Sequence, residues 1–308
     1  MRIAAMAAGA VGGYFGARLA AAGHDVFFIA RGANLAAIKA NGLRLESKHG
    51  DLHLPKVNVT DDPRDVGAVD IVLFAVKLWD TEHAAELTKP LVNEATRVIT
   101  LQNGIDSLER IAPILGAEQT VAGVTHIATV IAAPGVIRHT SAFARMTFGR
   151  ADKKPDAALD AFVAAGKAAK IDLDLSPDIE RDRWQKFIFL TAMSGATAAF
   201  RSSIGPIAAD PDLRDFLRQL MEEAYAVGRA SGVALDHAAI DERMAQIAGT
   251  IEPGMKASMA HDLERGNRLE LDWLSGKVRA LGRALGVPTP ASDTVWNVLK
   301  LHRNGAQH

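Results

Sequence analysis

The sequence predicts an α/β fold, with a doubly wound, mostly parallel sheet in the first part of the chain and a second, all-α domain after it. In the first half, short apolar or β-branched runs alternate with helical segments, and a glycine-rich turn follows the first run. Beyond Ser176 few strand signals remain. The 308 residues are about twice the commonest domain size, so we expect two domains, 1–172 and 173–308.

The order of predicted elements in the first domain favours parallel strands joined by helices. The predicted strands are Arg2–Met6, Asp25–Ala30, Ile71–Val76, Arg97–Gln102 and Thr120–Val124. The predicted helices are Gly12–Ala22, Leu78–Leu91 and Ser107–Leu115. Between Ile127 and Gly149 the pattern changes, because Pro134-Gly135 separates two apolar stretches, and we expect a small antiparallel extension there.

The second domain is predicted to consist of long helices. After the run Ile171–Leu175, Ser176-Pro177-Asp178 is a favourable helix start, with Ser as N-cap and Pro at the first helical position. The helical stretches are Ile179–Phe200, Pro211–Ser231, Ala238–Ala248, Leu269–Leu285 and Ser292–His302.

Composition excludes several classes of function. The formal net charge is −1 and no run of Lys and Arg occurs, so no nucleic-acid partner is expected. Cysteine is absent, which removes disulfides, thiolate nucleophiles and cysteine-ligated metals, and any redox chemistry must come from a bound cofactor. With neither a signal peptide nor a membrane span indicated, we expect a cytoplasmic protein with no membrane partner.

The glycine-rich turn predicts a dinucleotide site on a Rossmann-type unit. Ala7-Ala8-Gly9-Ala10-Val11-Gly12-Gly13 follows the first strand and opens the first helix, where backbone amides and the helix dipole hold an anion. Gly9 and Gly12 match the second and third glycines of the fingerprint, and Ala7 replaces the first. A methyl at Ala7 is tolerable if its φ is negative, and we expect it to tighten the loop and weaken cofactor binding. The alternative is an ordinary strand–helix connection.

The residue after the second strand indicates which nucleotide is bound. An Asp or Glu at this point takes the ribose hydroxyls in NAD-binding units. Here the sequence is Ile29-Ala30-Arg31-Gly32, and Arg31 is suited to pair with a 2′-phosphate. This favours NADP over NAD, with a solvated surface arginine as the alternative.

Several motifs together resemble the ketopantoate reductase (2-dehydropantoate 2-reductase) family over nearly the whole chain. They are Gly9 to Gly16, Arg31, Val76-Lys77, Gln102-Asn103-Gly104, Trp184-Gln185-Lys186, Ser258-Met259, Glu270-Leu271-Asp272 and Gly286-Val287-Pro288-Thr289-Pro290. The resemblance implies an enzyme of pantothenate biosynthesis in which NADPH delivers a hydride to the ketone carbon of a 2-oxo acid and a lysine supplies the proton. The lysine at the matching position is Lys186.

A lysine is chemically suited to this role, because an ammonium beside a developing alkoxide both stabilises negative charge and donates a proton. Lys186 lies between Trp184 and the apolar run Phe187 to Leu190, which indicates a position near an interior. Burial there would lower its pKa towards the working pH. For a helical lysine taken alone, a solvated face is the simpler reading.

Other site residues follow from strand ends and from the resemblance. Lys77 and Asn103 come just after predicted parallel strands, at the edge where ligands bind, and the resemblance gives them cofactor and substrate contacts. Asn103 also fits an ordinary Asn-Gly turn. By resemblance, Ala128 contacts the nicotinamide end of the cofactor through its backbone.

The resemblance also gives roles to two residues of the second domain. Glu270, expected on a helix, would orient the substrate hydroxyl or the cofactor, and a solvent-exposed acid beside Arg268 is the alternative. Ser258 would contact the substrate carboxylate.

The chain departs from the family at two substrate-binding positions. Two asparagines follow the lysine by four and eight residues in the family, on one helical face, and here these positions hold Leu190 and Ser194. An isobutyl group removes a polar anchor, worth roughly 1–3 kcal/mol in discrimination against a hydroxyl-bearing substrate. We therefore expect the reaction type to hold better than the identity of the substrate.

The sequence thus predicts an NADPH-dependent reductase of a 2-oxo acid, with Lys186 and Glu270 as catalytic residues. The alternatives are a reductase of a different keto acid or an imine, and a degenerate homologue that binds NADPH without turnover. His126, His139 and His261 lack metal-ligand spacing, so no metal is assigned. The apolar helical domain offers a surface for a homodimer, although the same residues could pack within one chain.

Overall fold

The computed structural model describes residues 1–306 and divides the chain into two compact units. One unit contains Met1–Gln102 and Asp106–Ile179, and the other contains Asn103–Ile105 and the residues from Glu180 onward. The expected boundary at residue 172 falls at the start of strand β10 (Asp172–Leu175), which pairs in parallel with β9 (Val136–Gly149) of the first unit. Because of this pairing, β10 belongs to the first unit, and the boundary between the units lies after it, at Ile179.

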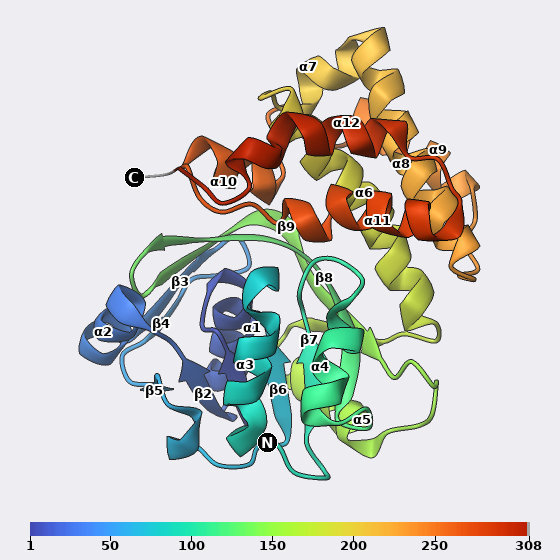
Figure 1. Cartoon of the computed structure of the whole chain (residues 1–308). Coiled ribbons are helices and arrows are strands. Elements are labelled where there is room, and N and C mark those ends of the chain that lie inside the picture. The colour runs from blue at the N-terminus through green and yellow to red at the C-terminus, as the bar shows by residue number, and fades with distance from the viewer. Residues whose placement is uncertain (307–308) are drawn as a thin grey trace. The chain divides into compact units, whose positions relative to one another are not determined.

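The first unit is built on a ten-stranded sheet (Figure 1). Its other strands are β1 (Arg2–Met6), β2 (Asp25–Ile29), β3 (Leu43–Ser47), β4 (Leu52–Leu54), β5 (Asn58–Thr60), β6 (Ile71–Phe74), β7 (Arg97–Thr100), β8 (Thr120–Ala133) and β9 (Val136–Gly149). The strand order is β4-β3-β9-β8-β7-β6-β1-β2-β5, with β10 beside β9. From β5 to β8 every neighbouring pair is parallel, so the predicted mostly parallel sheet is confirmed.

The five predicted strands of the parallel sheet are all present. The antiparallel extension is also confirmed, but it is longer than expected, because β8 and β9 each have 14 residues and pair around Pro134-Gly135. Strands β3, β4 and β5 were not predicted from the sequence. Strand β3 has five residues with Leu43 and Leu45 buried on one face, whereas β4 and β5 have only three residues each and are partly buried.

Helices cover both faces of this sheet. They are α1 (Ala10–Ala21), α2 (Gly32–Asn41), α3 (Thr81–Thr88), α4 (Ser107–Leu115) and α5 (Ala157–Ala168). Successive residues of a strand point to opposite faces. In β1, Ile3 and Ala5 pack in the core that contains α1 and α5, whereas Ala4 and Met6 pack in the core that contains α3 and α4. Burial on both faces explains why β1 is continuously apolar.

The second unit is helical, as predicted. It contains most of α6 (Ile179–Ala199), followed by α7 (Ile204–Ala209), α8 (Pro211–Ala230), α9 (Ala238–Gly249), α10 (Ser258–Glu264), α11 (Ser275–Leu285) and α12 (Pro290–Leu299), coloured yellow to red in Figure 1. The helix expected from Leu269 begins only at Ser275, because a short 3₁₀ turn, Leu271–Trp273, precedes it. Glu270 therefore caps this turn instead of lying within a helix.

One buried carboxylate holds the N-terminus of α12. Glu223 of α8 is 5% exposed and accepts hydrogen bonds from the backbone N–H groups of Ala291 and Ser292, at 2.7 and 2.8 Å. A negative charge at a helix N-terminus is stabilised by the unpaired amides and the helix dipole. No helix among residues 1–306 has the length and apolar character needed to cross a membrane.

Candidate functional site

The glycine-rich turn lies at the point where the direction of the sheet's strand order reverses. Strand β1 pairs with β2 on one side and with β6 on the other. In open parallel sheets, ligands bind outside the carboxyl ends of the strands at such a switch point. Residues 7–9 leave the end of β1 and lead into α1, and the loop that carries Lys77 leaves the end of β6. The glycine-rich turn and Lys77 therefore both lie at the carboxyl ends of the parallel strands.

The two fingerprint glycines serve different purposes in the turn. Gly9 is the N-cap of α1, and a Cβ built on it would meet nothing within 4 Å. A Cβ on Gly12 would lie 2.5 Å from the backbone oxygen of Ala7. Gly12 thus allows close packing within the turn, while Gly9 leaves the backbone open at the helix N-terminus. That open backbone beside Ala10 and Val11 fits the pyrophosphate of a dinucleotide.

Ala7 adopts a left-handed conformation, with a φ of 67°. The sequence expectation allowed for the alanine methyl on condition of a negative φ, and the structure does not meet that condition. A non-glycine residue in this region is strained, because its Cβ approaches the following carbonyl oxygen, at a cost of roughly 1–2 kcal/mol. The fingerprint glycine is therefore missing at a position where the backbone favours glycine.

Ala7→Gly is expected to stabilise the protein by about 0.5 kcal/mol. Relief of the strained φ, roughly 1–2 kcal/mol, is partly offset by the larger conformational entropy of glycine in the unfolded chain. Urea-induced unfolding measures the change. Ala36→Gly, at an exposed position of α2, is the matched control and should destabilise by roughly 0.5–1 kcal/mol. A loss of stability in both variants would contradict the assigned strain.

Arg31 is exposed at the N-cap of α2, directly after β2. Its guanidinium lies 3.5 Å from a carboxylate oxygen of Asp80, and both side chains remain largely open to solvent. Such an exposed ion pair is weak, so Arg31 can reorient towards an anionic ligand. The acidic neighbour also offers an acceptor for ribose hydroxyls, a feature that was not predicted from the sequence.

The loop after β6 is held to the end of β7. Gln102 donates hydrogen bonds to the carbonyl oxygen of Val76 at 3.2 Å and to Thr81 Oγ1 at 2.8 Å. Lys77 is exposed, and its Nζ lies 5.5 Å from the centre of the Trp79 ring. Gln102 therefore fixes the base of the loop while the Lys77 side chain extends from it.

Ala128 lies at an irregularity of the β8–β9 hairpin, where the register shifts between Ile127 and Thr129. Its N–H donates to Ser141 Oγ at 2.9 Å, and its carbonyl oxygen accepts a hydrogen bond from Thr140 Oγ1 at 3.3 Å. The opposite strand thus occupies the Ala128 N–H, and the carbonyl keeps one lone pair for a ligand. The nicotinamide contact expected for Ala128 stays a prediction.

The helical unit brings together three of the predicted site residues. Lys186 on α6 donates a hydrogen bond from Nζ to Asn103 Oδ1 at 3.1 Å. Glu270 is 5% exposed and interacts electrostatically with the same ammonium. Lys186 is half-buried and Glu270 is buried, so neither side chain lies on a fully solvated face, and the exposed-acid interpretation of Glu270 is wrong. Gly104 follows with a φ of 89°, so the chain bends at the Asn-Gly pair, and Asn103 also holds the lysine.

The environment of Lys186 changes its acidity. Desolvation lowers the pKa of its ammonium to about 8, although the negative charge of Glu270 raises the pKa and so opposes this shift. A group with this pKa is mostly protonated at neutral pH and gives up its proton far more readily than an ordinary lysine. The arrangement therefore suits proton donation to an oxygen that gains negative charge.

Arg183 also orders this site, and it was not predicted from the sequence. It is 6% exposed, donates to the carbonyl oxygen of Ile105, and pairs with Glu180 at 2.7 Å. Arg183 precedes Lys186 by one helical turn, so both cations of α6 hold the segment Asn103–Ile105. The three-residue spacing of these two cations on a predicted helix was the available signal.

The predicted substrate residues differ in exposure. Leu190 is half-buried and Ser258 is exposed, whereas Ser194 is 0% exposed. Within residues 1–306, Ser194 Oγ has no hydrogen-bond partner. Ser258 is the first residue of α10, and the preceding Ala257 N–H lies 3.4 Å from Thr197 Oγ1 of α6. The substrate contacts of these three residues stay predictions, and a contact with Ser194 would require its core neighbours to move.

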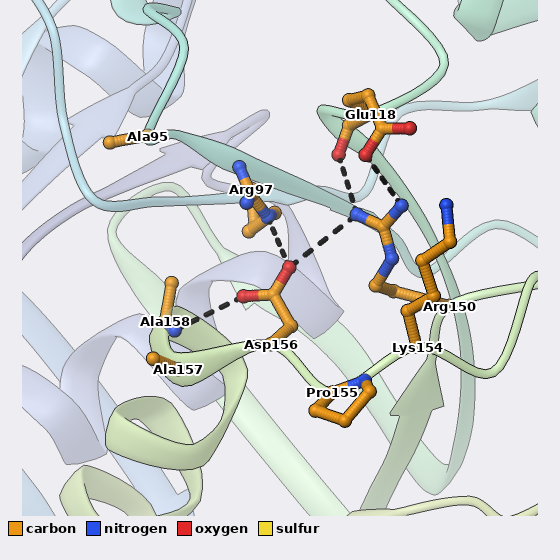
Figure 2. A pocket seen from close by; sticks show the side chains of 9 residues that line it. All are labelled: Ala95, Arg97, Glu118, Arg150, Lys154, Pro155, Asp156, Ala157 and Ala158. Carbon is orange, nitrogen blue, oxygen red and sulfur yellow. Dashed lines mark hydrogen bonds and ion pairs between the residues drawn. The ribbon is translucent and has the colours of Figure 1, made fainter.

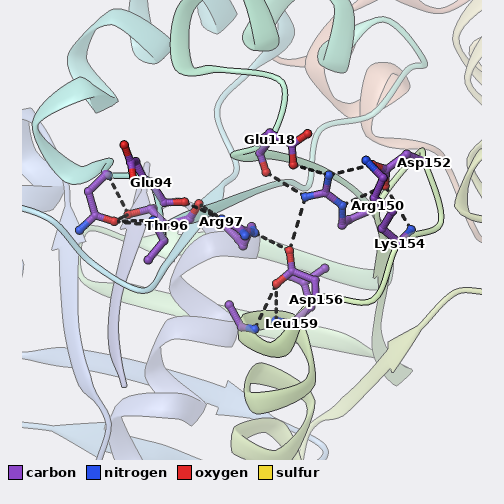
Figure 3. Close-up of polar contacts among 12 residues, drawn as sticks. Glu94, Thr96, Arg97, Glu118, Arg150, Asp152, Lys154, Asp156 and Leu159 are labelled. Atoms are coloured by element: carbon purple, nitrogen blue, oxygen red, sulfur yellow. Dashed lines mark hydrogen bonds and ion pairs between the residues drawn. The ribbon is translucent and has the colours of Figure 1, made fainter.

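A polar hollow of about 330 Å³ lies elsewhere on the first unit (Figure 2). At its centre Asp156, with a side chain 4% exposed, accepts a hydrogen bond from Arg97 at 2.5 Å and pairs with Arg150 at 3.5 Å. The same carboxylate accepts from the N–H groups of Ala158 and Leu159, and Figure 3 shows these contacts as one network.

This network is structural. Desolvation raises the pKa of Asp156, but the hydrogen bond and charge of Arg97, together with the N–H groups of Leu159 and Ala158, outweigh it and lower the pKa below its usual value. Arg150 is held further by Glu118 and Asp152, so the central charges are all paired. Arg97 is the first residue of β7, at the edge of the sheet opposite the glycine-rich turn. The hollow therefore lies away from the cofactor residues.

The fold, the glycine-rich turn of the first unit and the lysine site of the second unit define a class of protein. It is the class of oxidoreductases that have a Rossmann-type unit and a helical unit carrying a lysine. Comparison with known proteins gives the family. The model of ketopantoate reductase PanE/ApbA matches residues 3–153, and the model of its C-terminal part matches residues 178–303. The chain belongs to the ketopantoate reductase family.

Individual relatives agree with this assignment. The 2-dehydropantoate 2-reductase of Mesorhizobium japonicum is 32% identical, over 97% of each chain. The crystal structure of a PanE/ApbA family ketopantoate reductase from Ralstonia eutropha JMP134 is 35% identical, covers 98% of each chain and has a TM-score of 0.90. A D-mandelate dehydrogenase solved with NADH and anilino(oxo)acetate has a TM-score of 0.90, covers 98% of each chain and is 20% identical, a likeness of fold alone.

Proposed function

We propose that the protein reduces a 2-oxo acid to a 2-hydroxy acid with NADPH. The family supports a nicotinamide-dependent oxidoreductase that acts on a small keto acid. The hydrogen bond between Lys186 and Asn103, with the charge of Glu270 close by, is the observation that carries the proposal. It supplies a proton donor held in a defined position, which a protein that only binds nucleotides would not need.

The roles of the residues follow from the charge that develops on the substrate. When bound, the reduced nicotinamide supplies a hydride to C2 of the 2-oxo acid. The carbonyl electron pair moves to oxygen, and the Lys186 ammonium stabilises that charge and donates its proton to the oxygen. Asn103 accepts a hydrogen bond from the ammonium and orients it, while Glu270 favours its protonated form.

Arg31 supports the choice of NADPH. Arg31→Ala is expected to raise the dissociation constant of NADPH about 10- to 100-fold, because hydrogen bonds to charged groups contribute roughly 1.5–3 kcal/mol. The dissociation constant of NADH should change little. Calorimetric titration of both nucleotides tests this, with Lys39→Ala on α2 as the control for the loss of one positive charge.

Asp80 favours a second candidate, a reductase that uses NADH. Its carboxylate beside Arg31 is an acceptor suited to the ribose hydroxyls, and it repels a 2′-phosphate. Wild-type protein that binds NADH more tightly than NADPH would favour this candidate. In that case Asp80→Ala should weaken NADH binding and leave NADPH binding unchanged or improved.

A further inference from the structure

Beyond Lys186, helix α6 presents only apolar side chains to a ligand. From Phe187 to Ala198, ten of the twelve residues are buried, and the two that are half-buried are Phe189 and Leu190. Leu190 follows Lys186 by four residues, which places it about 6 Å further along the axis and on nearly the same face. Leu190 is therefore the α6 side chain next to the proton donor on the side away from Arg183.

The polar groups of this helix lie out of reach. Thr191 and Ser194 are both 0% exposed, and neither hydroxyl has a hydrogen-bond partner among the described residues. A ligand at the surface of α6 would have to displace core side chains to reach them. Phe189, the other accessible residue, is covered on its ring face by Arg243, whose guanidinium lies 5.4 Å from the ring centre. Leu190 is therefore the α6 side chain that we expect a substrate tail to meet.

We propose that this enzyme selects 2-oxo acids whose tail is purely aliphatic at the position that contacts Leu190. The inference rests on the proposed function and specifies its substrate class. A terminal hydroxyl placed against Leu190 would lose its hydrogen bonds to water and gain none from α6. The same tail without the hydroxyl would lose nothing and would bury its methyl groups against an apolar wall.

Two substrates that differ in one hydroxyl provide the test. They are 2-dehydropantoate and 3,3-dimethyl-2-oxobutanoate, which is the same molecule without the terminal hydroxyl. We expect kcat/KM to be about 10- to 100-fold higher for the aliphatic acid, the size of discrimination that an apolar pocket shows against an added hydroxyl. Calorimetric binding of the two corresponding 2-hydroxy acids, in the presence of oxidised nucleotide, should show the same preference without turnover.

Leu190→Asn assigns the preference to this residue. It should lower or reverse the ratio of the two kcat/KM values, while Leu281→Asn, at a half-buried position of α11, should leave the ratio unchanged. A wild-type preference for 2-dehydropantoate would overturn the inference but keep the proposed function. Reduction of neither acid, with NADPH or with NADH, would overturn both.

Discussion

Lys186→Met is expected to lower kcat about 10²- to 10⁴-fold, the usual contribution of a positioned general acid. Methionine keeps most of the length and volume of the side chain, so it should leave the packing of α6 intact while it removes the proton and the charge. Steady-state oxidation of NADPH with a 2-oxo acid measures the loss. Lys167→Met, at an exposed position of α5, is the matched control and should retain full activity.

The pH dependence of the wild-type enzyme gives an independent check of the same assignment. A general acid acts in its protonated form, and the pKa of Lys186 is lowered to about 8, chiefly by desolvation. Activity should therefore fall as the pH rises through about 8, whereas an unperturbed lysine would stay protonated up to about pH 10. Glu270→Gln removes the charge that raises this pKa, so it should shift the decrease in activity to lower pH.

Two results would contradict the role of Lys186. One is a Lys186→Met variant with near wild-type kcat, and the other is a wild-type profile that stays flat from pH 7 to 10. Thermal unfolding of the variant separates loss of chemistry from loss of structure, because only a folded protein with unchanged NADPH affinity reports on proton donation.

The parallel sheet could be predicted from the sequence because burial on both faces makes its strands continuously apolar. Strand β1 is an example, because each residue from Ile3 to Met6 is at most 2% exposed. The edge strands β4 and β5 carry no such pattern, because their exposed faces admit residues such as His53 and Asn58. Their pairing depends on partners far away in the sequence, and local preference does not encode it.

At the lysine site, too, the sequence motifs identified residues but could not predict the contacts between them. Lys186 and Glu270 were identified through motifs, and the structure adds that Asn103 accepts a hydrogen bond from the lysine. The buried state of Glu270 could not be predicted, because a carboxylate near Arg268 in the sequence reads as an exposed acid. Its burial depends on how the turn before α11 packs in the helical core, which is a property of the folded unit.

The φ of Ala7 illustrates a limit of a different kind. The missing glycine was recognised from the fingerprint, but the sequence does not state which backbone conformation the alanine adopts. The left-handed φ follows from the tight path between β1 and α1, where the Ala7 carbonyl oxygen approaches Gly12.

The second large effect is expected on cofactor binding, because the backbone at Gly9 is open where the pyrophosphate would bind. Gly9→Ala is expected to raise the dissociation constant of NADPH about 10- to 100-fold, because the methyl holds the pyrophosphate away from the amides of α1 and weakens charge-assisted hydrogen bonds worth roughly 1.5–3 kcal/mol. The protein without cofactor should keep its Tm within about 3 °C, since the added Cβ meets no atom within 4 Å and φ is −81°.

Gly12→Ala should behave differently, because its Cβ would lie 2.5 Å from a backbone oxygen that cannot move without distorting the turn. It is expected to lower the Tm of the protein without cofactor as well as its NADPH affinity. Gly249→Ala, at another open glycine on α9, controls for the general effect of the substitution and should change neither quantity appreciably. If Gly9→Ala bound NADPH as tightly as the wild-type protein, the pyrophosphate could not rest on these amides, since the methyl occupies the space that such a contact requires.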